Sequence, residues 1–180
     1  MTATCVVRPA RPEEHAQIAE LTRAAYAEYG QIMAPTAWSA LAAAVETALA
    51  TKERVERIVA IQNGQMAGSV MLYNAGSDAY AGQIEQANVP EVRMLAVHPS
   101  ARGQGISEAL MHECVRRARA AGAAQIGLHT SASMRAAIAL YQRMGFTRAP
   151  AFDFQPLGAE LITAYRLDLA HDAKSDSGSH

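Results

Sequence analysis

A cationic residue, two glycines and a hydroxyl follow one another in the middle of the chain. The run Arg102-Gly103-Gln104-Gly105-Ile106-Ser107 precedes an amphipathic pattern that predicts a helix beginning at about Gly105. The first N–H groups of a helix have no partners within it and carry partial positive charge. Glycine lets such a backbone approach a phosphate, and arginine adds a fixed charge. The pattern predicts either a phosphate or pyrophosphate site or a tight turn that needs glycine only for its shape.

Two common nucleotide sites fit this stretch poorly. A dinucleotide fingerprint needs a third glycine, and Glu108 stands there. The next expected strand, 125–130, is followed by no acid that would bind a ribose. The sequence also lacks the Gly-Lys-Ser/Thr of a P-loop. Both interpretations are therefore weakened.

An apolar run lies immediately before the glycine-rich turn. Residues 94–97 are continuously apolar, which is typical of a short strand covered on both faces. The strand extends back to Glu91. A period of two would place Glu91, Arg93, Leu95 and Val97 on one face.

Hydrophobic periodicity and turn signals predict the other elements. Asn63-Gly64 is a strong hairpin signal, and the segment 74–90 reads either as a binding loop or as a loose surface loop. The order of elements predicts a mixed α/β sheet with helices on both faces. We expect one domain over residues 1–169 and a disordered tail at 170–180. The expected strands are 5–8, 57–62, 66–73, 91–97, 125–130 and 162–169, and the expected helices are 11–30, 36–51, 105–122 and 134–144.

Composition narrows the class of protein. Half of the 180 residues are hydrophobic, 18% are charged and the net charge is −1, which predicts a folded domain with no general attraction to nucleic acid or anionic membrane. No apolar run approaches the roughly 20 residues of a membrane span. The start of the chain lacks the pattern of a signal peptide, and two cysteines, Cys5 and Cys114, suggest buried thiols in a reducing cytoplasm. No pair of His, Cys or acids has metal-ligand spacing, so we expect no metal.

Two segments together carry a family resemblance. Residues 95–107, LAVHPSARGQGIS, resemble the acyl-CoA-binding motif Arg/Gln-x-x-Gly-x-Gly/Ala of the GNAT family of N-acetyltransferases. Residues 137–146, AIALYQRMGF, resemble the family's downstream segment A-x-x-L-Y-x-x-x-G-F. The resemblance covers roughly residues 5–169. It implies the GNAT fold, in which a central mixed sheet has helices on both faces and its two central parallel strands splay apart.

The resemblance implies acetyl-CoA as co-substrate. The backbone of the strand would bind the pantetheine arm, and the N–H groups of the turn would bind the pyrophosphate. Two departures stand in this region: Ser107 replaces the usual Gly or Ala, and Glu108 adds a negative charge. Met134 stands where many members carry an asparagine that contacts the pantetheine. The implied cofactor-binding residues are Leu95, Ala96, Val97, Arg102, Gly103, Gln104, Gly105, Ile106, Ser107 and Met134.

The resemblance also implies catalytic residues. Tyr141 matches the family's general acid, which would protonate the leaving thiolate. Glu91 matches the position of a catalytic glutamate in some members, and the N–H of Val97 would stabilise the oxyanion. Without the resemblance, Tyr141 could equally be a tyrosine that packs in the core. Glu91 could likewise be a solvated residue at the end of its strand. Glu85 is an alternative base, and His129 is a weaker candidate.

The implied activity is transfer of an acetyl group from acetyl-CoA to a primary amine of a small molecule, peptide or protein, by direct attack in a ternary complex. The alternative is an inactive acyl-CoA-binding sensor or interaction domain. The resemblance also suggests a homodimer. The acceptor pocket is expected to be formed by the two N-terminal helices and the 74–90 loop, with Tyr26, Tyr29, Trp38, Asp78, Tyr80 and Glu85 as candidates.

Overall fold

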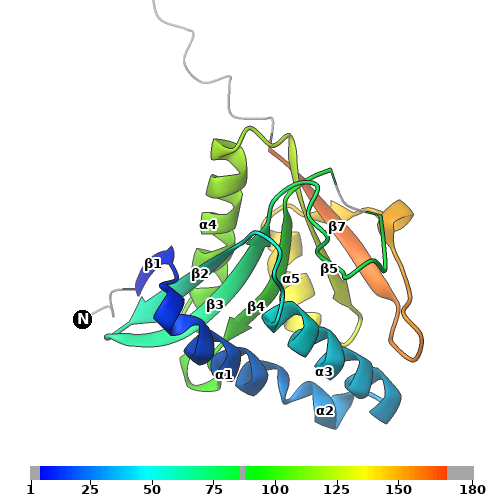
Figure 1. Cartoon of the computed structure of the whole chain (residues 1–180), viewed down its shortest axis with the longest axis horizontal. Coiled ribbons are helices and arrows are strands. Elements are labelled where there is room, and N and C mark those ends of the chain that lie inside the picture. Colours follow the sequence, from blue (N-terminus) through cyan, green and yellow to red (C-terminus); the bar gives the residue numbers. More distant parts are fainter. Residues whose placement is uncertain (1–4, 86–87, 170–180) are drawn as a thin grey trace, which may run out of the picture.

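A twisted seven-stranded sheet forms the centre of the molecule (Figure 1). The computed structural model describes residues 5–85 and 88–169, so the expected tail at 170–180 and the first four residues lie outside the described residues. The strands are arranged in the order β1-β2-β3-β4-β5-β7-β6. Only β4 and β5 pair in parallel, and every other neighbouring pair is antiparallel. The predicted mixed sheet is confirmed.

The elements follow the predicted order with a few additions. The strands are β1 (Cys5–Pro9), β2 (Val55–Gln62), β3 (Gln65–Tyr73), β4 (Glu91–Val97), β5 (Gln125–Ser131), β6 (Thr147–Arg148) and β7 (Ile162–Asp168). The α-helices are α1 (His15–Tyr26), α2 (Tyr29–Ile32), α3 (Pro35–Leu49), α4 (Ile106–Ala120) and α5 (Arg135–Arg143). Short 3-10 turns lie at Pro12–Glu14, Pro99–Ala101 and Pro150–Phe152.

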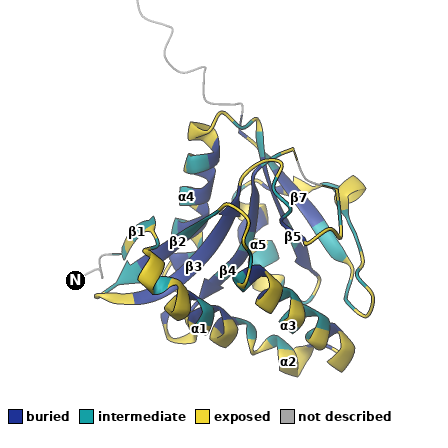
Figure 2. Ribbon diagram, viewed as in Figure 1, coloured by how far each residue is buried: buried dark blue, intermediate teal, exposed yellow. Residues whose placement is uncertain are grey.

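Helices cover both faces of the sheet, as predicted. Helices α1 and α3 lie on one face, and α4 and α5 lie on the other (Figure 1). The larger core lies under α4, where Leu110, Met111 and Cys114 are fully buried. Figure 2 shows the central strands β3, β4 and β5 largely buried between these layers, while the outer faces of the helices are exposed. Burial of these apolar stripes supplies the main driving force for the fold.

Two local predictions differ in outcome. The hairpin at Asn63-Gly64 is confirmed, because these residues adopt φ values of +51° and +76°, as a tight primed turn requires. The single helix expected over 11–30 is wrong. Helix α1 ends at Tyr26, and hydrogen bonds then shorten to i→i+3 spacing, from Gly30 N to Ala27 O at 3.1 Å. Gly30 therefore lies inside α2 rather than closing the first helix.

Strand β4 contains a bulge that the sequence pattern concealed. Its pairing with β3 shifts between Arg93 and Ala96, and Met94 adopts φ +53°. An extra residue of this kind inverts the alternation of side chains beyond it. Arg93 and Met94 consequently lie on the α3 side, whereas Leu95 and Val97 pack under α4. The prediction that Glu91, Arg93, Leu95 and Val97 share one face is therefore wrong.

The two parallel strands separate after a short contact. Strand β4 pairs with β5 only at Glu91 with Gly127 and at Val92 with Leu128. Strand β5 continues to pair with β7 along its whole length, so it diverges from β4 toward its carboxyl end. The expected splay between the central parallel strands is present.

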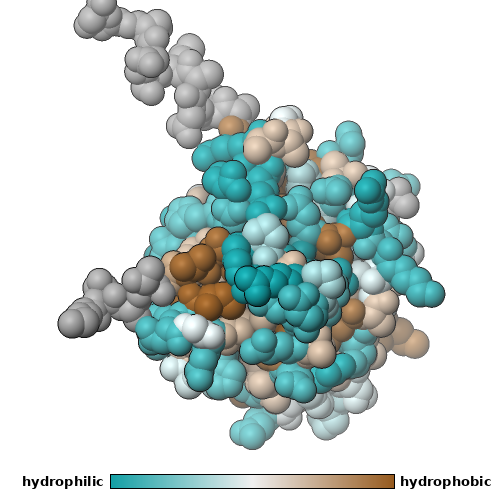
Figure 3. All heavy atoms as spheres, turned by 60° about the vertical axis from the view of Figure 1, so that its left-hand side comes forward, coloured by the Kyte–Doolittle hydropathy of each residue, from teal (hydrophilic) through white to brown (hydrophobic). Residues whose placement is uncertain are grey.

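One face of the molecule is mostly polar. Figure 3 shows a largely hydrophilic face with small, separate hydrophobic groups. None of the helices within the described ranges combines the length and hydropathy needed to cross a bilayer.

An ion pair fixes the entry into the first helical layer. Arg8, on β1, donates to both oxygens of Glu14 at 2.8 and 2.6 Å, and Glu14 also accepts the N–H of Arg11 at 2.7 Å. The bonds from Arg8 and Arg11 outweigh the opposing effect of burial and lower the pKa of Glu14 from 4.5 to about 2. These contacts tie β1 to the start of α1.

We expect Glu14→Gln to lower the melting temperature at pH 7 by about 2–4 °C. Because the folded-state pKa is depressed, the ionised carboxylate stabilises the fold above pH 4.5, and that contribution is lost as pH falls toward 2. The difference from the wild type should therefore shrink below pH 4.5 and vanish near pH 2. Thermal unfolding across this range measures it, with Glu13→Gln as control. A difference that stayed constant with pH would contradict the charge-based explanation.

Candidate functional site

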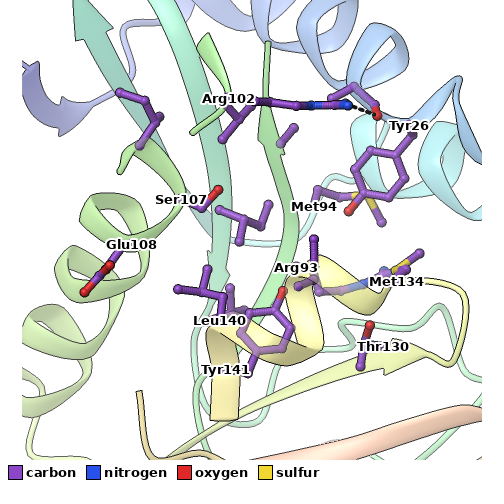
Figure 4. A pocket seen from close by; sticks show the side chains of 18 of the residues that line it. Tyr26, Arg93, Met94, Arg102, Ser107, Glu108, Thr130, Met134, Leu140 and Tyr141 are labelled. Atoms are coloured by element: carbon purple, nitrogen blue, oxygen red, sulfur yellow. Dashed lines mark hydrogen bonds between the residues drawn. The ribbon is translucent and has the colours of Figure 1, made fainter. Parts of the chain in front are cut away.

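A cavity of about 380 Å³ opens where β4 and β5 diverge (Figure 4). Its floor is β4 from Val92 to Val97, and its walls come from the end of α1, the start of α4 and helix α5. His98 N–H bonds to Ala67 O of β3 at 2.8 Å. Because successive residues of a strand direct their backbone groups to alternate sides, Val97 and Leu95 direct theirs toward the open side. A bound extended chain can pair with this edge.

The glycine-rich turn forms one end of this cavity. Gly103 and Gly105 have φ values of +73° and +78°, a conformation in which a Cβ is strained. Gly105 is the N-cap of α4, so the free N–H groups of the first helical turn begin here. At both glycines an added Cβ would meet no protein atom within 4 Å. The turn thus combines an open approach with a helix N-terminus, as anion binding requires.

Three charged or polar side chains adjoin the turn. The guanidinium of Arg102 donates to Glu28 Oε2 at 2.6 Å and to Ala25 O at 3.2 Å, which links the turn to the end of α1 (Figure 4). Ser107 and Glu108 also line the cavity, and Glu108 Oε1 lies 3.5 Å from His112 Nε2, one turn along α4. Arg102 therefore meets a carboxylate that a bound phosphate would have to replace. Gln104 instead directs its amide to Ser100 O at 3.4 Å.

Tyr141 and Met134 reach the cavity from the α5 side. Figure 4 shows the hydroxyl of Tyr141 pointing toward the middle of the cavity, next to β4. Its ring packs on Phe146 with the ring centroids 5.9 Å apart, which explains the role of the Gly145-Phe146 pair that follows α5. Burial, reinforced by the nearby Tyr26 and Tyr29, raises the pKa of Tyr141 above its ordinary value. The hydroxyl therefore stays protonated and can donate.

Glu91 is not a solvated strand end. It is 1% exposed, and its Oε1 accepts the hydroxyl of Tyr80 at 2.8 Å and contacts His129 Nδ1. The other ring nitrogen of His129 lies 3.0 Å from Phe152 O, and since a carbonyl only accepts, Nε2 carries a hydrogen. His129 therefore bridges the carboxylate of Glu91 and the carbonyl of Phe152. Glu91 lines neither cavity, whereas its partner Tyr80 lines the second cavity and His129 lines both.

Gly127 makes this buried cluster possible. It stands opposite Glu91 at the point where β4 and β5 pair. A Cβ there would lie 2.7 Å from Glu91 Oε2 and 3.0 Å from Arg166 Nη1. Both side chains cross the strand in the space that glycine leaves.

A second cavity of about 400 Å³ adjoins the first on the α3 side of the sheet. The two cavities share six residues, namely Tyr26, Arg93, Met94, His129, Thr130 and Met134. The second is bounded by α3, by the described part of the 74–90 loop and by the segment between Phe154 and Ile162. The binding-loop interpretation of 74–90 gains support, because Asp78 and Tyr80 line this cavity.

The expected acceptor residues divide between the cavities and the rest of the molecule. Tyr26 lines both cavities, and Tyr29 lines the first. Trp38 packs against Gly30, and Glu85 is exposed on the loop. Sequence reasoning missed Arg93 and Glu160, which line the second cavity. A cation inside an otherwise apolar strand was the available signal for Arg93.

Glu160 reaches the second cavity from the segment before β7. It accepts hydrogen bonds from the hydroxyl and the backbone N–H of Ser133. Although burial opposes ionisation, these hydrogen bonds lower the pKa of Glu160. It is therefore a carboxylate at neutral pH.

The two cysteines line neither cavity. Cys5 and Cys114 are free, and burial raises the pKa of Cys114 to about 12, so its thiol is unreactive. Within residues 5–85 and 88–169, no three His, Cys, Asp or Glu side chains come together as a metal site would require.

Comparison with solved structures places this fold among acetyltransferases. A ribosomal-protein alanine N-acetyltransferase from Escherichia coli aligns with a TM-score of 0.63 at 20% identity, covering 95% of this chain and 97% of its own. A GNAT acetyltransferase from Brucella melitensis in complex with acetyl-CoA aligns with a TM-score of 0.57 at 20% identity, and the alignment covers 94% of this chain and 90% of that chain. An acetyltransferase from Salmonella typhimurium with its cofactor acetyl-CoA aligns with a TM-score of 0.60 at 20% identity, and the alignment covers 97% of this chain and 99% of that chain. At these identities the likeness concerns the fold.

The family itself is established by sequence. The model of the acetyltransferase (GNAT) family matches residues 16–146, which include the splayed strands, the glycine-rich turn and Tyr141. The match joins both motifs with the elements between them, and the chain therefore belongs to the acetyltransferase (GNAT) family.

Proposed function

We propose that this protein is an N-acetyltransferase that transfers an acetyl group from acetyl-CoA to a primary amine. The observation that carries the proposal is the open edge of β4, with the glycine-rich turn at one end of the cavity and Tyr141 beside its middle. Two solved structures of similar fold contain acetyl-CoA, which supports it as the donor. Residues 1–169 would act as one catalytic domain.

Each part of acetyl-CoA has a complementary region in the first cavity. The backbone of Leu95, Ala96 and Val97 would pair with the pantetheine arm, and Met134 would pack beside it. The pyrophosphate would accept the N–H groups between Gly103 and Ser107. Arg102 would leave Glu28 to bind it, exchanging one anion for another. Gln104 would hold the turn by the hydrogen bond from its amide to Ser100 O. Ile106 would hold it by packing into the core under α4.

The reaction would proceed by direct attack within a ternary complex. The neutral amine forms a bond to the thioester carbon, and the N–H of Val97 stabilises the oxyanion. The carbon–sulfur bond then breaks, Tyr141 protonates the thiolate, and the amine loses its proton to water. The products are the N-acetylated amine and CoA.

Glu91 would orient His129 and Tyr80 rather than take the proton itself. The carboxylate is buried, and its Oε1 is already engaged by the hydroxyl of Tyr80 and by His129. We therefore favour a water relay as the base.

The two free cysteines fit a cytoplasmic location. The resemblance to the family is the sole support for a homodimer.

Thermal unfolding with saturating ligands tests the proposal. At about 100 times its dissociation constant a ligand adds roughly 2.7 kcal/mol, which should raise the melting temperature by about 5–10 °C. We expect this rise with acetyl-CoA and CoA but not with NAD, followed by amine-dependent thiol release. No rise with acetyl-CoA would refute the donor site. A rise without thiol release from any amine would favour an acyl-CoA-binding sensor instead.

A further inference from the structure

The second cavity has the size of a small-molecule site and a mixed lining. Its volume of about 400 Å³ falls within the range of ligand pockets. Alanines 37, 40, 44 and 48 of α3 provide short side chains along one wall, and Leu41 and Phe154 add larger apolar groups. Such a wall accommodates an apolar body rather than a polar one.

Arg93 supplies the main positive charge at the inner end of this cavity. Its Nη1 donates to Ala79 O, and its Cζ lies 4.2 Å from the ring centroid of Tyr80. Ala79 and Tyr80 line the second cavity, so the guanidinium lies on that side of the shared floor. In the part of the chain that the structure describes, no carboxylate forms an ion pair with Arg93.

The acids near Arg93 are held by other partners. Asp78 Oδ1 accepts the N–H of Tyr80 at 3.3 Å and the N–H of Gly82 at 2.9 Å, which stabilises the loop. Glu160 is bonded to Ser133, and Glu91 to Tyr80 and His129. A half-buried guanidinium with several unused donors and no acidic partner is suited to bind an anionic group of a ligand.

The position of Arg93 limits which amine could carry that anion. Arg93 lines both cavities, so a group bound to it lies beside the end of the acetyl-CoA site. The amine of the acceptor must reach the same place to attack the thioester. In an α-amino acid one carbon joins the amine to the carboxylate, so both can be near this junction while the side chain extends along α3.

We propose that the acceptor is a free α-amino acid with an apolar side chain, whose carboxylate pairs with Arg93. The inference rests on the proposed N-acetyltransferase function. Arg93 would orient the α-amine toward the thioester carbon, and the alanine face of α3 would bind the side chain. A peptide N-terminus has an amide where the free amino acid has its carboxylate, so it would lose the charged contact.

The test compares acceptors that share the side chain of leucine and an amine, but that keep, replace or lack the carboxylate beside that amine. Thiol release from acetyl-CoA is followed with L-leucine, L-leucinamide, isoamylamine and a tripeptide with N-terminal leucine. Charged hydrogen bonds of this kind predict a kcat/KM for leucine about 100-fold above that of the other three. Lysine and glutamate, whose side chains are charged, should also be poorer acceptors than leucine.

Arg93→Met should collapse the preference for leucine over leucinamide to near one, mainly through a higher KM for leucine. Arg57→Met, on β2 and outside both cavities, is the matched control and should retain the preference. The comparison of acceptors on the wild-type protein stands even if Arg93→Met fails to fold.

Calorimetric binding of acetyl-CoA separates the two possible failures. If acetyl-CoA does not bind, the proposed function itself fails. If acetyl-CoA binds, and leucinamide or the tripeptide reacts as fast as leucine, the inference about the carboxylate is overturned. The proposed acetyltransferase function would still stand. Binding without acetylation of any amino acid would overturn it as well.

Discussion

Replacing Tyr141 with phenylalanine should lower kcat by about 100-fold and leave the affinity for acetyl-CoA nearly unchanged. A positioned general acid contributes on the order of 10²–10⁴-fold to a rate. The substitution removes only the hydroxyl, so the ring keeps its packing on Phe146 and the cavity keeps its shape. Steady-state kinetics measure the change in kcat, and calorimetry measures acetyl-CoA binding.

Tyr165→Phe is a suitable control, because this tyrosine lies in β7 outside both cavities. It should keep wild-type turnover. If Tyr141→Phe also kept wild-type turnover, Tyr141 would be a packing residue and the leaving thiolate would take its proton from water.

The pH profile offers an independent check on Tyr141. Because burial raises its pKa, the hydroxyl stays protonated, and able to donate, up to higher pH than an exposed tyrosine. The acceptor amine, by contrast, becomes a better nucleophile as pH rises and it loses its proton. Turnover should therefore increase from pH 6 to 9 without a decline that belongs to Tyr141.

Replacing Gly105 with alanine should weaken acetyl-CoA binding on the order of 10–100-fold. The residue has φ +78°, and a Cβ in the left-handed region costs about 1–2 kcal/mol. The added methyl group would occupy open space at the turn where we place the pyrophosphate. Binding calorimetry with acetyl-CoA, together with the free energy of unfolding, measures both effects.

Gly122→Ala is a close control for backbone strain. Gly122 lies at the other end of α4, has φ +76° and also has no protein atom within 4 Å of an added Cβ. The two variants should lose similar stability, but only Gly105→Ala should lose affinity for acetyl-CoA. Equal affinities would mean that this turn does not bind the pyrophosphate.

Features built from neighbouring residues were predictable from the sequence. The hairpin depends on Asn63-Gly64, and the glycine-rich turn depends on Gly103 and Gly105, whose backbone preferences act locally. The helix that follows the turn began where predicted, with Gly105 as its N-cap. The split of the expected first helix into α1 and α2 was missed, and Gly30 lies inside α2, where it packs against Trp38 of the next helix.

Features that depend on contacts between distant segments were not predictable. The bulge at Met94 shows no composition signal, yet it moves Leu95 and Val97 to the opposite face from Arg93. The partnership of Glu91 with His129 spans 38 residues and depends on the space over Gly127. The second cavity likewise needs α3, the 74–90 loop and the segment before β7 to meet.

The sequence by itself therefore determined the family, the order of the elements and the turn at which a phosphate can bind, since each is encoded in short runs of residues. Only the tertiary structure decided that Glu91 is buried and that Arg93 is left without an acidic partner within the described residues. Glu91 is buried where β4 pairs with β5, over Gly127, and Arg93 lies beyond that pairing, against Ala79 and Tyr80 of the 74–90 loop. Backbone conformation in a turn is a local property, whereas the burial and pairing of a charge depend on every segment that surrounds it.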